Sequence, residues 1–288
     1  MALLFLCPFY QRSISNFIIV VMKKWVVVIL FLFIVIQVGF SQKQIISSNQ
    51  DWLGTVNQTR FSNRWGSYAE VLFRTKAILP DSLYQIMIRV AGVYYLSNTT
   101  RLSIGYAYED NFPADNHKKV YLPLHSPWQQ FSWGNKYNRL NVNQGLRLEE
   151  RFRHKVKNDY ELASGYNFNY RLRYNIVLNA ALGKRPFEPN TLAFSCYNEL
   201  FINFGKQVVY NTFDQNRFFI GMNYYVNKNS NLQFGYLNTF QQQSSGNQYK
   251  MMHSPRIYYY YNLDLAKKKE PKPNKKEITP PVINDHNP

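Results

Sequence analysis

The stretch FDQNRFFIGMNYYVNKNSNLQFGYLN, residues 213–238, decides the fold, because bulky apolar side chains alternate in it with polar or very small ones. In an extended chain Phe218 and Ile220 fall on one face, and Arg217 falls on the other. A helix would need apolar residues three and four positions apart, and the stretch lacks that spacing. A polar turn at 227–231 divides it. The stretch therefore predicts a β-hairpin with one apolar face and one polar face.

The same two-residue period recurs along the chain from Asp51 to Leu265. The clearest further segments are 67–78, 83–96, 100–110, 145–155 and 167–178, and additional strands are expected near 51–61, 128–138, 191–204 and 249–265. These segments give about 11 strands. Because closed outer-membrane barrels of bacteria normally have an even number, we expect 10–12 strands, with 12 preferred.

The start of the chain carries a targeting pattern. Met22-Lys23-Lys24 is a cationic start, and WVVVILFLFIVIQVGF (25–40) is an uncharged apolar core. We interpret 22–41 as a signal peptide cut before Gln42, although the length of the apolar run also permits a membrane anchor. Residues 1–21 precede a complete signal and indicate a mis-called start codon, or else a longer leader.

Two media are possible for the apolar faces of the strands. In a soluble sandwich these faces would pack on each other, whereas in a membrane barrel they would contact lipid. The leader, the strand lengths of 10–14 residues and the tyrosines on the apolar face, including the run Tyr258–Tyr261, favour the barrel. The predicted fold is therefore all-β, a single closed antiparallel transmembrane β-barrel over 42–265.

Location and partners follow from that fold. The protein is expected in the outer membrane of a Gram-negative bacterium, as a monomer that contacts outer-membrane lipid and the outer-membrane assembly machinery. Its formal net charge of +17 suits lipid phosphates better than nucleic acid, because the aromatic side chains and the arginines lie on opposite strand faces.

The polar strand faces carry arginine and glutamate rather than serine and threonine. By alternation, the inward side chains are Glu70, Arg74, Arg89, Glu109, Arg147, Glu149, Arg151, Arg171, Arg173, Glu199 and Arg217. Isolated buried charges are costly, so the side chains in a narrow lumen must pair. We predict an ion-pair network of Glu149, Arg151, Arg171, Arg173, Glu199 and Arg217 that closes the lumen. A selectivity filter for anions would use the same residues.

Catalytic and metal-binding patterns are weak. His125-Ser126 and His253-Ser254 are adjacent pairs, but neighbouring strand residues point to opposite faces, and no G-x-S-x-G elbow occurs. No C-x-x-C, H-x-H or H-E-x-x-H spacing is present, so no metal or cofactor is expected. The prediction is a structural or transport-like envelope protein. The alternatives are an envelope lipid-modifying enzyme acting through His125 and Ser126, and a soluble periplasmic β protein that binds an apolar ligand.

Several motifs occur together in one order. Glu149 and Arg151 are followed by Arg171 and Arg173, and then by YNELFINFG (197–205), FDQNRFFIGMNYY (213–225) and LQFGYLN (232–238). In this order and spacing the chain resembles an uncharacterised family of Gram-negative outer-membrane barrels labelled domain of unknown function 2490. The resemblance covers roughly 50–265, implies a single-domain barrel, and brings no established activity.

After Leu265 the composition changes to lysine and proline without aromatics, as in KKKEPKPNKK (267–276). Residues 266–288 are therefore expected to be a disordered tail, either merely solvated or used as a hook for peptidoglycan or a partner.

Overall fold

The computed structural model describes residues 43–76, 83–113 and 119–266, and all of the regular structure within these ranges is β-strand. The strands are β1 (Gln44–Asn49), β2 (Asp51–Arg60), β3 (Trp65–Thr75), β4 (Leu83–Tyr95), β5 (Thr100–Asn111), β6 (Leu122–Lys136), β7 (Leu140–Val156), β8 (Leu162–Ala181), β9 (Thr191–Phe204), β10 (Phe213–Tyr225), β11 (Ser230–Gln242) and β12 (Gln248–Asp264). The predicted leader segments 1–21 and 22–41 and nearly all of the predicted tail lie outside the described residues. Within the described ranges, no helix has the length and apolar character needed to cross a membrane.

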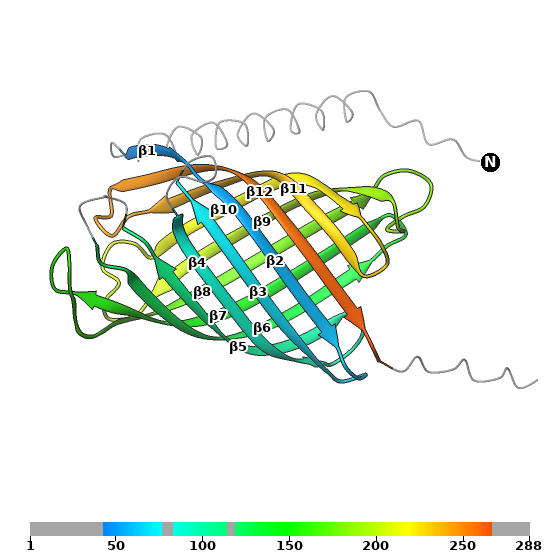
Figure 1. The fold of residues 1–288 in the computed structure, drawn as a ribbon, viewed down its shortest axis with the longest axis horizontal. Coiled ribbons are helices and arrows are strands. Elements are labelled where there is room, and N and C mark those ends of the chain that lie inside the picture. The colour runs from blue at the N-terminus through cyan, green and yellow to red at the C-terminus, as the bar shows by residue number, and fades with distance from the viewer. Residues whose placement is uncertain (1–42, 77–82, 114–118, 267–288) are drawn as a thin grey trace, which may run out of the picture.

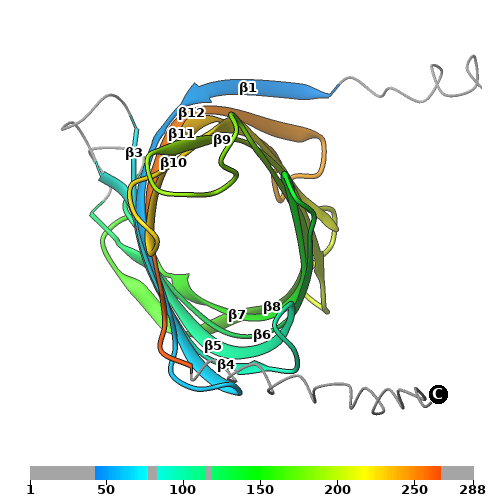
Figure 2. The same ribbon diagram turned by 90° about the vertical axis from the view of Figure 1, so that its right-hand side faces the viewer.

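The strands form one closed barrel (Figures 1 and 2). Each strand from β2 to β12 pairs antiparallel with the next, and β12 then pairs with β2 to close the ring. Gln44 of β1 lies opposite Gln248, and Trp52 of β2 lies opposite Arg256, so β1 and β2 keep one register against β12. They are one strand interrupted at Gln50, and the barrel has eleven strands. The prediction of a closed all-β barrel of 10–12 strands is confirmed.

The seam between β2 and β12 is parallel. Antiparallel neighbours alternate in direction, so the first and last of eleven strands must run the same way. The rule of even strand number is not met, and the preference for 12 strands was wrong. A consequence is that β2 begins at one end of the barrel and β12 finishes at the other (Figure 1).

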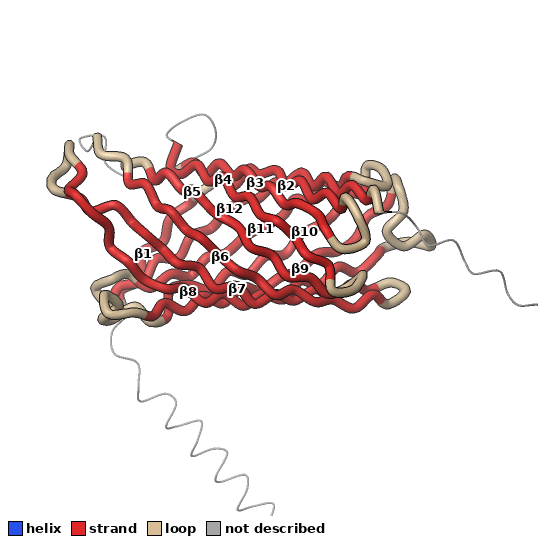
Figure 3. Tube along the Cα trace, turned by 90° about the horizontal axis from the view of Figure 1, so that it is seen from below, coloured by secondary structure: helices blue, strands red, loops and turns tan. Residues whose placement is uncertain are grey.

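The two ends of the barrel differ in their connections, as the tan segments in Figure 3 show. At the end where β12 finishes, the turns 61–64, 96–99, 137–139 and 226–229 have only three or four residues, and 182–190 is longer. The connections at the opposite end run from five to ten residues. The connection between β5 and β6 ends at Tyr121, because β6 begins at Leu122.

The strand faces divide by polarity. Outward apolar side chains are exposed around the barrel, with Ile104 71% and Ile88 47% exposed, while the inward positions are buried. The tyrosine run corrects one expectation: Tyr259 faces outward, but Tyr258 is only 3% exposed and points inward. Four consecutive strand residues alternate between faces, so the run cannot belong entirely to an outer girdle.

Candidate functional site: the barrel lumen

Alternation along seven strands brings a dense set of charges into the lumen. All eleven side chains predicted to point inward are buried or nearly so, and they come from β3, β4, β5, β7, β8, β9 and β10. Three further charged residues join them, Arg101 of β5, Asp214 of β10 and Arg256 of β12.

Arg171 is the centre of the largest ion-pair group. Its guanidinium lies 2.5 Å from the Glu149 carboxylate and 3.2 Å from the Asp214 carboxylate, and Arg147 approaches Glu149 at 3.7 Å. The side chains of Glu149 and Arg171 are 3% and 7% exposed. One arginine therefore bridges two buried carboxylates, which suits its planar array of donors.

Glu199 receives two arginines. Arg173 pairs with one carboxylate oxygen, and Arg217 lies 3.7 Å from the other. Arg173 and Glu199 come from neighbouring strands, and Glu199 lies directly opposite Arg217 in the pairing of β9 with β10. This geometry joins three strands through one carboxylate.

Glu70 and Arg89 form a third group, on the other side of the lumen. They lie 2.5 Å apart and opposite each other on β3 and β4. The Glu70 carboxylate also accepts hydrogen bonds from the hydroxyls of Tyr68, at 2.7 Å, and Tyr258, at 3.3 Å. The pair is thus satisfied by several partners, as a buried charge requires.

Arg151 and Arg74 differ from these groups. Neither forms an ion pair within 4.0 Å in the part of the chain that the structure describes, and each has a buried Nε without a hydrogen-bond partner there. Arg74 instead stacks on the Trp52 ring at 3.7 Å. Around the smaller cavity and its ion pairs, the described residues supply nine arginines and five carboxylates, so this interior favours anions. The arginines are Arg74, Arg89, Arg101, Arg147, Arg151, Arg171, Arg173, Arg217 and Arg256, and the carboxylates are Glu70, Glu109, Glu149, Glu199 and Asp214.

Asp214 and Arg256 were missed by the sequence reasoning. Asp214 is three residues from the inward Arg217 and should face outward, but an irregularity in the strand register between Phe213 and Gln215 turns it inward. Arg256 lies within the strand expected at 249–265, where the run Tyr258–Tyr261 was assigned as a whole to the outer apolar face. Strict alternation from the outward Tyr259 places Tyr258 and Arg256 on the inward face, where both are buried.

Aromatic rings also occupy the lumen, which alternation alone did not predict. Phe201 and Phe219 have no exposed surface, and Arg217 stacks on Trp52 at 5.0 Å and on Phe201 at 4.6 Å. Arg256 lies 3.5 Å from the centre of the Tyr258 ring. Arginine side chains stacked against rings thus form a layer in the middle of the barrel, with favourable cation–π contacts.

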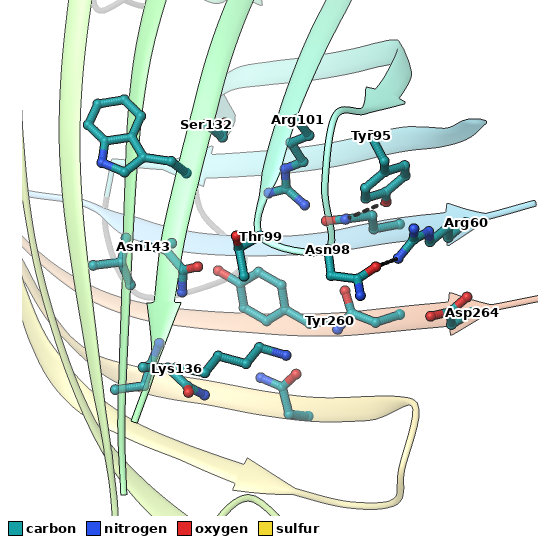
Figure 4. A pocket seen from close by; sticks show the side chains of 18 of the residues that line it. Arg60, Tyr95, Asn98, Thr99, Arg101, Ser132, Lys136, Asn143, Tyr260 and Asp264 are labelled. Carbon is teal, nitrogen blue, oxygen red and sulfur yellow. Dashed lines mark hydrogen bonds between the residues drawn. The ribbon is translucent and has the colours of Figure 1, made fainter. Parts of the chain in front are cut away.

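Two cavities that share part of their lining lie inside the barrel. The larger, here called the vestibule, has a volume of about 700 Å³ and lies at the end with short turns, between Asn98, Lys136, Tyr225 and Asp264 (Figure 4). A smaller cavity of about 270 Å³ lies among the charged groups and rings themselves, with Trp52, Arg217 and Tyr258 in its lining. Arg101 lines both cavities.

The predicted serine–histidine candidates are divided between the two faces. His125 faces outward and bonds through Nδ1 to the Tyr106 hydroxyl, while Ser126 is 2% exposed and points inward. His253 likewise bonds to Tyr236, and Ser254 is fully buried. Neither pair forms a dyad, because strand geometry directs adjacent side chains apart.

The described residues contain no group of three or more histidine, cysteine, aspartate or glutamate side chains placed to hold a metal ion. The lumen carboxylates are each engaged by arginine or by neutral hydrogen-bond donors rather than gathered together.

The barrel and the order of its strand motifs can be compared with known proteins. A family model described as "Protein of unknown function (DUF2490)" matches residues 49–250, which is most of the chain and nearly the whole barrel. The chain belongs to this family. The resemblance found in the sequence is thereby confirmed, and the family description assigns no activity.

Among solved structures, the chain is similar to the NanC porin in a rhombohedral crystal form. The identity is 11%, the match covers 69% of this chain and 90% of that chain, and the TM-score is 0.39. A search of curated proteins finds no match.

Proposed function

We propose that this chain is an outer-membrane β-barrel whose ion-paired interior closes the lumen between the vestibule and the opposite end. The observation that carries the proposal is the inversion of polarity. Charged side chains are buried inside, and large apolar side chains are exposed outside on strands all around the barrel.

Lipid is the medium that fits this exterior. Exposed apolar residues occur on every strand from β3 to β12, among them Phe73, Ile88, Ile104, Phe131, Leu146, Tyr174, Phe194, Phe218, Phe234 and Ile257. Soluble monomers rarely expose contiguous apolar surface on this scale. Strands of ten residues or more are long enough to cross a bilayer, and β2 to β12 all reach that length.

The six residues predicted to form the lumen network support closure. Five of them, Glu149, Arg171, Arg173, Glu199 and Arg217, make ion pairs at two centres on adjoining strands. Arg151 lies in the same lumen without an ion pair within 4.0 Å in the described ranges. In the proposed closure, these pairs between neighbouring strands hold the arginine side chains around the smaller cavity and block a continuous water path beyond it.

Membrane fractionation of cells that express the full chain tests the proposal. The protein should sediment with outer membranes, require detergent for extraction, and migrate differently on gels before and after heating. A purified chain that stays dispersed and folded without detergent would overturn the membrane assignment and favour the soluble alternative.

An anion-selective pore is the second candidate, and the excess of arginine over carboxylate in the lumen is the observation that favours it. Conductance in planar bilayers separates the two candidates. A closed lumen predicts no stable single-channel steps for the wild-type chain, whereas a filter predicts steps with a reversal potential set by anions.

A further inference from the structure

We propose that the vestibule is a binding site for a small polyhydroxylated anion, with Arg101 as the anchor of its charged group. This goes beyond the proposed function, because binding in the vestibule does not depend on the medium that surrounds the barrel. Its volume of about 700 Å³ lies within the range of ordinary ligand sites.

The charges of the vestibule are unbalanced. Its lining contains Arg60, Arg101, Lys136 and Lys228 but a single carboxylate, that of Asp264. None of these five side chains forms an ion pair within 4.0 Å across the described ranges. A concave site with this excess attracts anions and raises their local concentration.

Arg101 and Arg60 differ in how their guanidinium groups are engaged. Arg60 bonds to Asn98 Oδ1 at 3.1 Å and to two backbone carbonyls of the β2–β3 turn, and it stacks on the Tyr95 ring at 4.4 Å. The Arg101 guanidinium extends into the vestibule (Figure 4) and makes no hydrogen bond or ion pair with any described residue. Its donors are therefore open to a carboxylate or phosphate, which a guanidinium binds through two parallel hydrogen bonds.

The remaining lining suits hydroxyl groups. Thirteen of the 28 lining residues are asparagine or glutamine, and a carboxamide both donates and accepts hydrogen bonds, as a hydroxyl does. The side chains of Asn141, Asn143 and Asn175 make no hydrogen bond with a described side chain or backbone group, so their amides remain open to a ligand.

Isothermal titration of the full chain in detergent tests the inference with three probes: gluconate, glucose 6-phosphate and glucose. Gluconate or glucose 6-phosphate should bind at least tenfold more tightly than glucose, and added NaCl should weaken that binding. The tighter of the two anions identifies the charged group as a carboxylate or a phosphate. Absence of binding by both anions, or equal binding of glucose, would overturn the inference.

Variants locate the site. Arg101→Gln should weaken anion binding at least tenfold, whereas Arg64→Gln should leave it unchanged, because Arg64 lies on the exposed β2–β3 turn at the same end and does not line the vestibule. Circular dichroism melting confirms that each variant is folded. Lys136→Gln is the second variant if Arg101→Gln does not fold, with a weakening of about threefold expected. The site would be refuted if a folded Arg101→Gln or Lys136→Gln variant bound the anion as tightly as the wild-type chain. It would also be refuted if Arg64→Gln weakened anion binding as much as they do.

Discussion

Gly54 on β2 lies directly opposite Tyr258 on β12 across the parallel seam, and the Tyr258 ring occupies the space that a side chain at Gly54 would fill. The Tyr258 hydroxyl reaches the Glu70 carboxylate at 3.3 Å, and Arg256 stacks on the ring. The closing contact of the barrel is therefore tied to the ion pairs of the lumen. Closure and the charged interior stabilise each other.

The seam glycine gives the first prediction. A Cβ at Gly54 would lie 2.5 Å from Tyr258 Cζ, so Gly54→Ala must displace the ring and should cost about 1–3 kcal/mol of unfolding free energy. Gly92 of β4 is the matched control, because no atom outside its own neighbours lies within 4 Å of a Cβ there. Urea unfolding in detergent measures both variants. Equal stability of the two would show that the ring does not require the glycine.

The Arg171 group gives a second prediction. Glu149→Ala removes the closest partner of Arg171 and leaves a buried guanidinium with Asp214 alone, which should cost about 3–5 kcal/mol. Glu161→Ala is the control, because Glu161 pairs with Lys157 at 2.8 Å on the exposed surface, where an ion pair contributes about 1 kcal/mol at most. A loss of stability in Glu161→Ala as large as in Glu149→Ala would contradict the special cost of the buried pair.

Glu199 and Arg173 allow an independent test of the same idea on another pair. Either Glu199→Ala or Arg173→Ala should lower the melting temperature in detergent. Glu199→Ala leaves the Arg173 charge unpaired inside the barrel, and Arg173→Ala leaves Glu199 with only the more distant Arg217. The double variant should lose less than the two single losses added together, since the second change removes the charge that the first one orphaned. Unchanged melting in both single variants would argue against the ion-paired plug.

Much of the barrel follows from the period of two in the sequence, because alternation fixes which side chains face the lumen. Arg217 and Glu199 face inward for that reason. The strand count could not be fixed in the same way. The local sequence does not indicate which two strands pair across the seam. The general preference of such barrels for an even number of strands then shifted the expected count away from eleven.

The lumen aromatics escaped prediction because polarity was used to assign faces. Phe218 and Phe219 are adjacent, so one of them had to face inward, and Phe219 is the one that does. The inward glycines offered a second signal. Gly105, for example, leaves room for the Trp128 ring, at 2.6 Å from a Cβ placed there. A ring needs such space when it lies flat against the barrel wall.

The arginine–ring layer gives a prediction on ion flow. Arg217 stacks on both Trp52 and Phe201, so Arg217→Ser removes a group that fills the middle of the lumen. Single-channel recordings should show steps for Arg217→Ser that the wild-type chain lacks. Arg185→Ser, a change in the exposed β8–β9 loop, should behave as the wild-type chain does. Steps of the same size in both variants would exclude the layer as the barrier.

The odd strand number gives a prediction on topology. Because the seam is parallel, Gln44 lies beside the β11–β12 loop, and its backbone N–H donates a hydrogen bond to the Asn247 carbonyl. Asn63 lies on the β2–β3 turn, at the other end of the barrel. In a background with both Cys7→Ser and Cys196→Ser, single cysteines at Gln44, Ser245 and Asn63 can be labelled from outside intact cells with a thiol reagent that does not cross membranes. Gln44→Cys and Ser245→Cys should react alike, and Asn63→Cys should react only after the cells are opened, or the reverse if the barrel inserts the other way. Suppose that Gln44→Cys and Asn63→Cys were labelled on the same side of the membrane and Ser245→Cys on the other side. That result would require an even number of strands and a different seam.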